Sequence, residues 1–119
     1  MTGVRGKNEN AAQRALAAMH CVPKAPKLST KELADRLVCL TGWKHIGDRI
    51  EKSFRFADYH KTIAFVNAVA KIANREDHHP DLSVYYDRCV VVWSTHTAGG
   101  VTLNDCICAA NVEEIAAAA

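Results

Sequence analysis

The chain has 119 residues, of which 15 are Lys or Arg and 13 are Asp or Glu, so its formal net charge is only +2. A chain of this length buries roughly two-thirds of its unfolded surface, which predicts a single domain that needs no disulfide or metal ion to fold. The weak charge, without a run of basic residues, argues against nucleic-acid binding, and no apolar run approaches the roughly 20 residues of a membrane span.

The amino-terminal part carries little information about function. We expect residues 1–26 to form an extension that is either flexible or a short helix, and residues 27–119 to form the domain. Scattered basic residues among alanines would also suit a transit-like segment, although Glu9 argues against one. The five cysteines are odd in number and lack a CxxC pair, which favours reduced thiols and a cytoplasmic location, with a nuclear or organellar pool as the alternative.

The first elements of the domain follow from capping and turn signals. Ser29 is a suitable N-cap for a helix over residues 30–40, and Gly42 ends it. Residues 43–46 and 50–56 alternate as two strands, and the Gly47-Asp48 pair between them predicts a hairpin.

The second half repeats the pattern of helix and hairpin. Asp58 is a suitable N-cap for a helix over residues 59–75. Its predicted apolar stripe consists of Ile63, Val66, Ala70 and Ala73, widened by Phe65, Val69 and Ile72. Pro80 excludes further helix, so residues 82–86 and 89–96 predict a second hairpin that turns at Asp87-Arg88. Thr102 then caps a final helix over residues 103–115.

This order, α-β-β-α-β-β-α, predicts an α+β fold of two layers, with a four-stranded antiparallel sheet and its helices packed on one face. The sheet keeps an open edge or face. Small proteins often cover such a surface with a second copy, so we expect a homo-oligomer, either a dimer or a tetramer.

Histidines gather around the second hairpin. A turn at Asp87-Arg88 would place His79 opposite His96, with Cβ atoms about 4.5 to 5.5 Å apart. His78 adjoins them, and Asp105 in the first turn of the last helix could orient an imidazole. Because histidine exchanges protons near neutral pH, the cluster indicates acid/base chemistry.

Simpler interpretations compete with this one. His20, His45 and His60 are each isolated, which favours surface or structural roles. Asp105 also fits a capping box with Thr102, which alone would explain it. Zinc is disfavoured because HExxH and CxxC are absent, and Cys89 or Cys106 as a nucleophile is disfavoured because neither lies in an exposed turn.

The motifs in this region resemble those of the pterin-4a-carbinolamine dehydratase family, which in animals also acts as a dimerisation cofactor of a homeodomain transcription factor. The resemblance covers about residues 27–115. It is carried by Asp77-His78-His79-Pro80, Tyr86, Ser94-Thr95-His96, the run from Ala98 to Asp105, and Gly42-Trp43.

The resemblance implies dehydration of 4a-hydroxytetrahydropterin to quinonoid dihydropterin, in tetrahydrobiopterin recycling, without a cofactor or metal. His78 and His96 would be the acid/base pair, His79 would orient the pterin, and Asp105 would hold a histidine. Further substrate contacts would come from Trp43, Asp77, Ser94, Thr95 and Thr97.

Two positions depart from the family pattern. Asn74 stands where a glutamate is usual, which puts the tuning of the first histidine in doubt, and Leu82 stands where many members have tryptophan. The alternative function is a protein-interaction module with a vestigial pterin site, for which a transcription-factor partner is suggested by the family alone.

Overall fold

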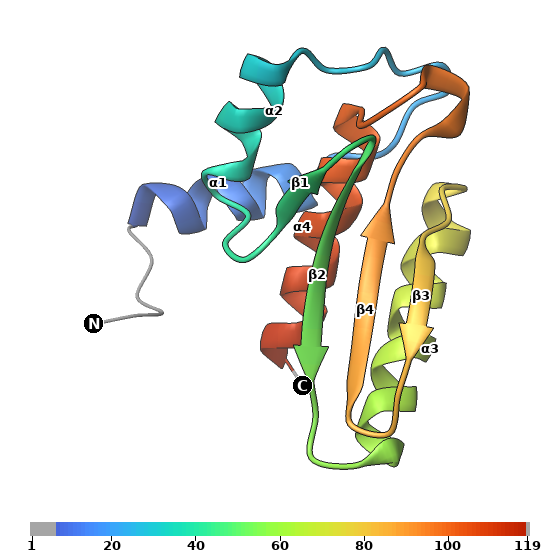
Figure 1. Cartoon of the computed structure of the whole chain (residues 1–119). Helices are drawn as coiled ribbons and strands as arrows, with labels where there is room; N and C mark the ends of the chain where they lie inside the picture. Colours follow the sequence, from blue (N-terminus) through green and yellow to red (C-terminus); the bar gives the residue numbers. More distant parts are fainter. Residues whose placement is uncertain (1–6, 119) are drawn as a thin grey trace.

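The computed structural model describes residues 7–118, and its elements follow the predicted order after one additional helix (Figure 1). The helices are α1 (Lys7–Ala17), α2 (Thr30–Leu37), α3 (Tyr59–Glu76) and α4 (Leu103–Ala118), with a short 3-10 helix η1 (His96–Ala98). The strands are β1 (Lys44–Ile46), β2 (Arg49–Arg55), β3 (Asp81–Val84) and β4 (Arg88–Trp93).

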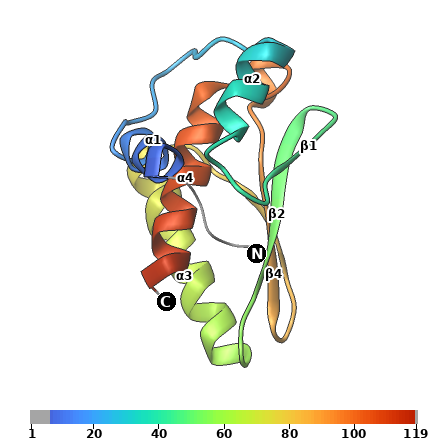
Figure 2. The same cartoon turned by 90° about the vertical axis from the view of Figure 1, so that its left-hand side faces the viewer.

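The four strands form one antiparallel sheet in the order β1-β2-β4-β3, and the helices lie on one side of it (Figure 2). The predicted α+β class is therefore confirmed. Along β4, Cys89, Val91 and Trp93 are buried under the helices, while the residues between them are half-buried. This alternation is that of a strand with one face on the core and one toward solvent.

Local signals fix several element ends where they were predicted. The Ser29 hydroxyl accepts from the Glu32 amide and the Glu32 carboxylate accepts from the Ser29 amide, which completes a capping box. Asp58 caps α3 by accepting from the Lys61 amide. Gly47 has a φ of 60°, and the pairing of Ile46 with Arg49 leaves Gly47-Asp48 as the predicted two-residue turn.

The apolar stripe of α3 is rotated from the predicted one. Its buried line runs through Phe65, Val69, Ile72 and Ala73, whereas Ala70, also a member of the predicted stripe, is exposed. The large side chains that were predicted only to widen the stripe form most of its core, because they bury more apolar area than alanine does.

In the second hairpin the pairing register is shifted by two residues from the predicted one, and the turn by one residue. Val84 pairs with Cys89, and the Tyr85 amide donates to the Arg88 carbonyl at 2.8 Å, so Tyr86 and Asp87 form the turn. The carbonyl of Tyr86 accepts from the Thr62 hydroxyl of α3, and that of Asp87 accepts from the Phe56 amide. These contacts from distant segments select the register, so the predicted pairing of His79 with His96 is wrong.

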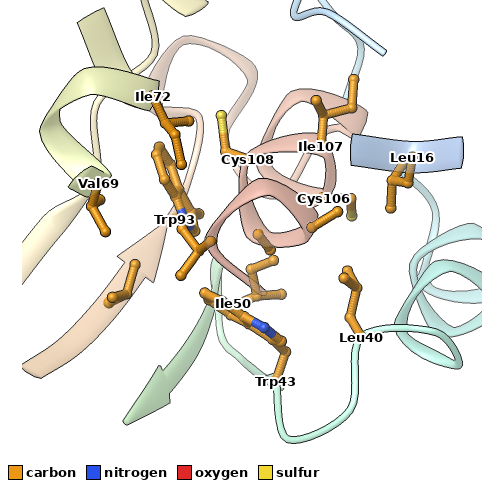
Figure 3. Packing of buried hydrophobic residues seen from close by; sticks show 14 of the residues in the cluster. Leu16, Leu40, Trp43, Ile50, Val69, Ile72, Trp93, Cys106, Ile107 and Cys108 are labelled. Atoms are coloured by element: carbon orange, nitrogen blue, oxygen red, sulfur yellow. The ribbon is translucent and has the colours of Figure 1, made fainter. Parts of the chain in front are cut away.

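The amino-terminal helix α1 packs against α4, and its Leu16 is buried in the main apolar cluster (Figure 3 shows Leu16 beside α4). The segment that follows is held by side chains of the domain. The Cys21 amide donates to Glu76 at 2.7 Å, and the Val22 amide and carbonyl pair with the Asn104 side chain at 3.0 and 2.8 Å. Within residues 7–118, no helix is both long and apolar enough to cross a membrane.

Candidate active site

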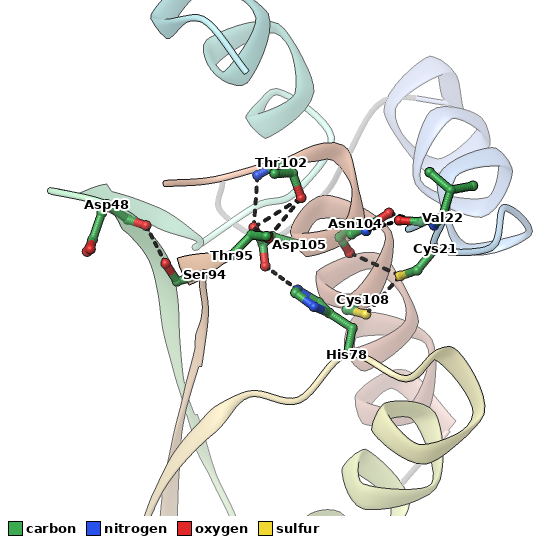
Figure 4. Close-up of polar contacts among 10 residues, drawn as sticks. All are labelled: Cys21, Val22, Asp48, His78, Ser94, Thr95, Thr102, Asn104, Asp105 and Cys108. Carbon is green, nitrogen blue, oxygen red and sulfur yellow. Dashed lines mark hydrogen bonds and ion pairs between the residues drawn. The ribbon is translucent and has the colours of Figure 1, made fainter. Parts of the chain in front are cut away.

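The site forms where α3 ends, β4 ends and α4 begins. Asp77 ends α3 in the left-handed conformation, with a φ of 51°, and the amides of Asp77 and His78 both donate to the Ala73 carbonyl. Aspartate tolerates this conformation better than most residues. The resulting turn directs the His78 side chain toward the first turn of α4 (Figure 4).

His78 is held by Asp105. Its Nε2 lies 2.5 Å from Asp105 Oδ1, and the carboxylate is fully buried while the histidine side chain is 14% exposed. An ionised carboxylate can only accept a hydrogen bond, so Nε2 carries the hydrogen and donates it. In the neutral ring Nδ1 is then unprotonated, and among the described residues it has no hydrogen-bond partner.

The second oxygen of Asp105 organises the loop on the other side. Oδ2 accepts from the Thr95 hydroxyl at 2.8 Å and from the Thr102 amide at 2.8 Å. The Thr102 hydroxyl lies 2.9 Å from that of Thr95. Because the Thr95 hydrogen is used by the carboxylate, the Thr102 hydroxyl donates to Thr95. Asp105 therefore caps α4 and orients an imidazole at the same time, which joins the two interpretations left open by the sequence.

His96 follows Thr95 directly and begins η1, where it is exposed. A backbone bridge between Thr95 and Gly100 closes the loop that carries it. His96 and His78 are thus attached to opposite sides of one carboxylate: His78 through its own ring, and His96 through the adjacent Thr95.

His79 is also exposed, and its Nε2 lies 3.1 Å from Asn74 Oδ1. The residue that departs from the family pattern thus contacts the second histidine, not the first. An amide at this position supplies a hydrogen bond without the charge that a glutamate would bring.

The remaining predicted contacts fall into two groups. Ser94 donates to the Asp48 carbonyl at 2.7 Å, which ties the end of β4 to the β1-β2 turn, while Thr97 and the Asp77 side chain are exposed. Trp43 lies in the core, 6.0 Å from the Phe54 ring, and its Nε1 donates to Glu113. Glu113 is eight residues beyond Asp105 on α4, about 12 Å along the helix axis, so the contacts of Trp43 lie away from His78.

Trp93 is a neighbour of the site that was not predicted. Its ring stacks on that of His78, with centroids 5.6 Å apart and planes inclined by 16°. The predicted turn at Asp87-Arg88 implies that Trp93 lies opposite Leu82, whereas in the structure Leu82 pairs with Val91 and Trp93 lies beside His78.

Burial argues against the cysteine alternative. Cys89 and Cys106 are both fully buried, and burial, reinforced by the charge of Asp105, raises the pKa of Cys106 to about 12. A thiol that stays protonated near neutral pH is a poor nucleophile. Within residues 7–118, no group of three or more His, Cys, Asp or Glu side chains is arranged to hold a metal ion.

A buried carboxylate lies beside the site at the end of α3. Burial opposes ionisation of Glu76, but hydrogen bonds from the Cys21 amide, His20 and Arg75 outweigh it and lower its pKa to about 2. Glu76 therefore anchors the amino-terminal segment next to Asp77 and His78. Beside it, Cys21 Sγ lies 3.6 Å from Cys108 Sγ (Figure 4).

Comparisons with known proteins agree with the motifs. The family model described as pterin 4 alpha carbinolamine dehydratase matches residues 26–115. Proteins provisionally named pterin-4-alpha-carbinolamine dehydratase are 50% identical in Chromobacterium violaceum and 51% identical in Xanthomonas campestris pathovar campestris. Each match covers 84% of this chain, and respectively 94% and 89% of the relative.

A solved structure supports the same assignment. The transcriptional coactivator/pterin dehydratase of Brucella melitensis superimposes with a TM-score of 0.73 at 33% identity, over 76% of this chain and 98% of that one. The fold, the matched span and the relatives agree, and we conclude that the chain belongs to the pterin-4a-carbinolamine dehydratase family.

Proposed function

We propose that the protein dehydrates 4a-hydroxytetrahydropterin to quinonoid dihydropterin and water. The observation that carries the proposal is the shared carboxylate: Asp105 holds His78 through one oxygen and Thr95, the neighbour of His96, through the other. This arrangement supports two imidazoles acting on one small substrate.

The reaction removes a hydroxyl group from the carbinolamine carbon and a proton from the adjacent ring nitrogen, and a carbon–nitrogen double bond forms. His78 suits the role of base, because Asp105 keeps the hydrogen on Nε2 and leaves Nδ1 able to take a proton. His96 suits the role of acid, since its exposed ring can protonate the departing hydroxyl group. The proton counts balance, with water as the leaving molecule.

His79 suits substrate binding. It is exposed, adjoins the base, and is restrained by Asn74 at its Nε2. We place Thr95 and Asp105 as positioning groups. Asp77, Ser94 and Thr97 border the same loops, and we infer that Trp43 supports the site through the core rather than by contact with the pterin.

The test is a spectrophotometric assay of enzymatically generated 4a-hydroxytetrahydropterin. We expect His78→Ala and His96→Ala each to lower kcat by about tenfold or more, because positioned acid/base groups contribute about 10² to 10⁴-fold. His45→Ala is the matched control, since its ring is exposed and contacts the Gly47 carbonyl. Wild-type rates for both site variants in folded protein would refute the proposal.

We also propose that the protein forms a homo-oligomer in the cytoplasm. Strand β3 has β4 as its neighbour on one side and no strand on the other within the described chain. An apolar groove of about 330 Å³ between α3 and α4, lined by Phe56, Phe65, Ala68 and Ile115 among others, offers a second surface for another copy. Sedimentation analysis distinguishes a dimer or tetramer from the monomer that would contradict the proposal.

An interaction module is the second candidate, because the Brucella melitensis protein is described as a transcriptional coactivator as well as a pterin dehydratase. Binding of a pterin without turnover by wild-type protein would favour this function over catalysis.

A further inference from the structure

A tryptophan lies directly behind the proposed base. Trp93 is the last residue of β4, opposite Ile50 of β2, and it is fully buried. Figure 3 shows its indole between Ile72 and Val69 of α3 on one side and Cys108 of α4 on the other. The strand and both helices thus fix the plane of the indole.

The imidazole of His78 rests on this fixed plane. The two rings are nearly parallel, inclined by 16°, with their centroids 5.6 Å apart. Asp105 holds the same imidazole at its Nε2 edge. Protein therefore holds one edge of the ring and borders one of its faces, and a substrate can reach the ring through the 14% of the side chain that stays exposed.

Packing alone does not account for a tryptophan at this position. Its Nε1 is the buried side-chain nitrogen or oxygen for which no hydrogen-bond partner is found in the described part of the chain. A buried donor without a partner destabilises a fold, and an aliphatic side chain would fill the space without that cost. What the indole adds is a broad aromatic face, which attracts positive charge more strongly than other side-chain rings do.

We propose that Trp93 is a positioning residue for proton transfer at His78. Its indole fixes the plane in which Nδ1 points to the substrate, and its face attracts the positive charge that the imidazole acquires on taking a proton. This inference rests on the proposed dehydratase function, and it names a residue that never touches the pterin.

Two substitutions separate the contribution of the aromatic face to kcat from that of side-chain volume. Trp93→Phe keeps a ring under His78 and removes the unpartnered N–H, whereas Trp93→Leu keeps an apolar side chain without a ring. We expect kcat to fall by about fivefold to tenfold in Trp93→Leu and by less than about threefold in Trp93→Phe, with KM for the pterin unchanged in both. Both substitutions leave a cavity where the indole stood, and phenylalanine is only slightly larger than leucine, so rescue by phenylalanine is attributed to its ring.

A buried ring away from the site supplies the control. Phe54 contacts Trp43 and Phe65 instead of a histidine, so Phe54→Leu should lower stability while the folded fraction keeps wild-type kcat. Should Trp93→Leu fail to fold, Trp93→Met provides the variant without a ring.

A second measurement does not depend on turnover. In ¹⁵N-histidine spectra, wild-type His78 should show one tautomer with hydrogen on Nε2, and Trp93→Leu should show exchange between tautomers or ring orientations. If the wild-type protein is inactive but the His78 spectrum still differs between wild type and Trp93→Leu, the proposed function is refuted while the positioning of His78 by Trp93 stands. Unchanged kcat and an unchanged His78 spectrum in Trp93→Leu would overturn the inference.

Discussion

Replacing Asp105 by asparagine tests how the site fixes the base. The amide has the shape of the carboxylate but only one accepting oxygen, and Asp105 accepts from His78, Thr95 and the Thr102 amide. If the amide oxygen faces the threonines, the NH₂ group meets one other donor, His78 Nε2–H. In the reverse orientation the NH₂ group meets two donors, the Thr95 hydroxyl and the Thr102 amide. We therefore expect the first orientation, which opposes fewer donors.

In that orientation His78 must accept a hydrogen bond at Nε2, so its hydrogen moves to Nδ1. The nitrogen that faces the substrate can then no longer take a proton. A hydrogen bond to a charged group contributes about 1.5 to 3 kcal/mol, which corresponds to a loss of about 10-fold to 150-fold in kcat. KM should change by less than about threefold, because Asp105 is fully buried and does not reach the substrate.

Steady-state kinetics and ¹⁵N spectra of the imidazole measure the two consequences separately. Asp35→Asn is the control for removing a carboxylate, since Asp35 is exposed on α2 and pairs with Lys31. A folded Asp105→Asn variant with kcat within twofold of wild type would refute the reasoning, as would a His78 that keeps its hydrogen on Nε2.

Three further predictions concern residues around the site. In urea titrations, Glu76→Gln should lower the free energy of unfolding at pH 7 by about 2 to 3 kcal/mol. Because the folded-state pKa of Glu76 is depressed from 4.5 to about 2, this stabilisation is present above pH 4.5 and is lost as the pH falls toward 2. The free energies of unfolding of the two proteins should therefore converge near pH 2. A constant difference down to that pH would contradict the depressed pKa of Glu76. Asn74→Ala removes the partner of His79 and should raise KM about threefold with little change in kcat, whereas equal KM values for wild type, Asn74→Ala and His79→Ala would exclude a binding role. Asp58→Ala removes the cap of α3 and should lower stability by about 1 kcal/mol in thermal melts while leaving kcat unchanged; an altered kcat would show that the far end of α3 influences the site.

The elements of the domain could be predicted because their signals are local. Ser29 and Asp58 act through backbone amides three residues away, and Gly47 supplies a positive φ within its own turn. The register of the second hairpin could not be predicted in this way. It depends on Thr62 and Phe56, which approach the Tyr86-Asp87 turn only after α3 and β2 have packed.

The contact between His78 and Asp105 was also expected from local signals. The motif indicated His78, and the place of Asp105 in the first turn of the last helix indicated that it could orient an imidazole; the structure brings the two side chains together. Stacking of Trp93 on His78 depends on the true strand register and on the turn at Asp77, and neither has a local signal. Trp43 carries a family motif, yet its indole N–H is used by Glu113 in a part of the fold that only tertiary packing defines.

The way the amino-terminal segment is fastened to the domain has a practical consequence for recombinant work. The match to the family model begins at residue 26, but Leu16 fills part of the core, and His20 and Cys21 supply two of the hydrogen bonds on the Glu76 carboxylate. A protein trimmed to residues 26–115 would expose apolar surface on α4 and would leave the buried Glu76 carboxylate with Arg75 but without His20 and Cys21. Expression trials should therefore begin upstream of α1, and affinity tags are better placed ahead of that helix than at residue 26.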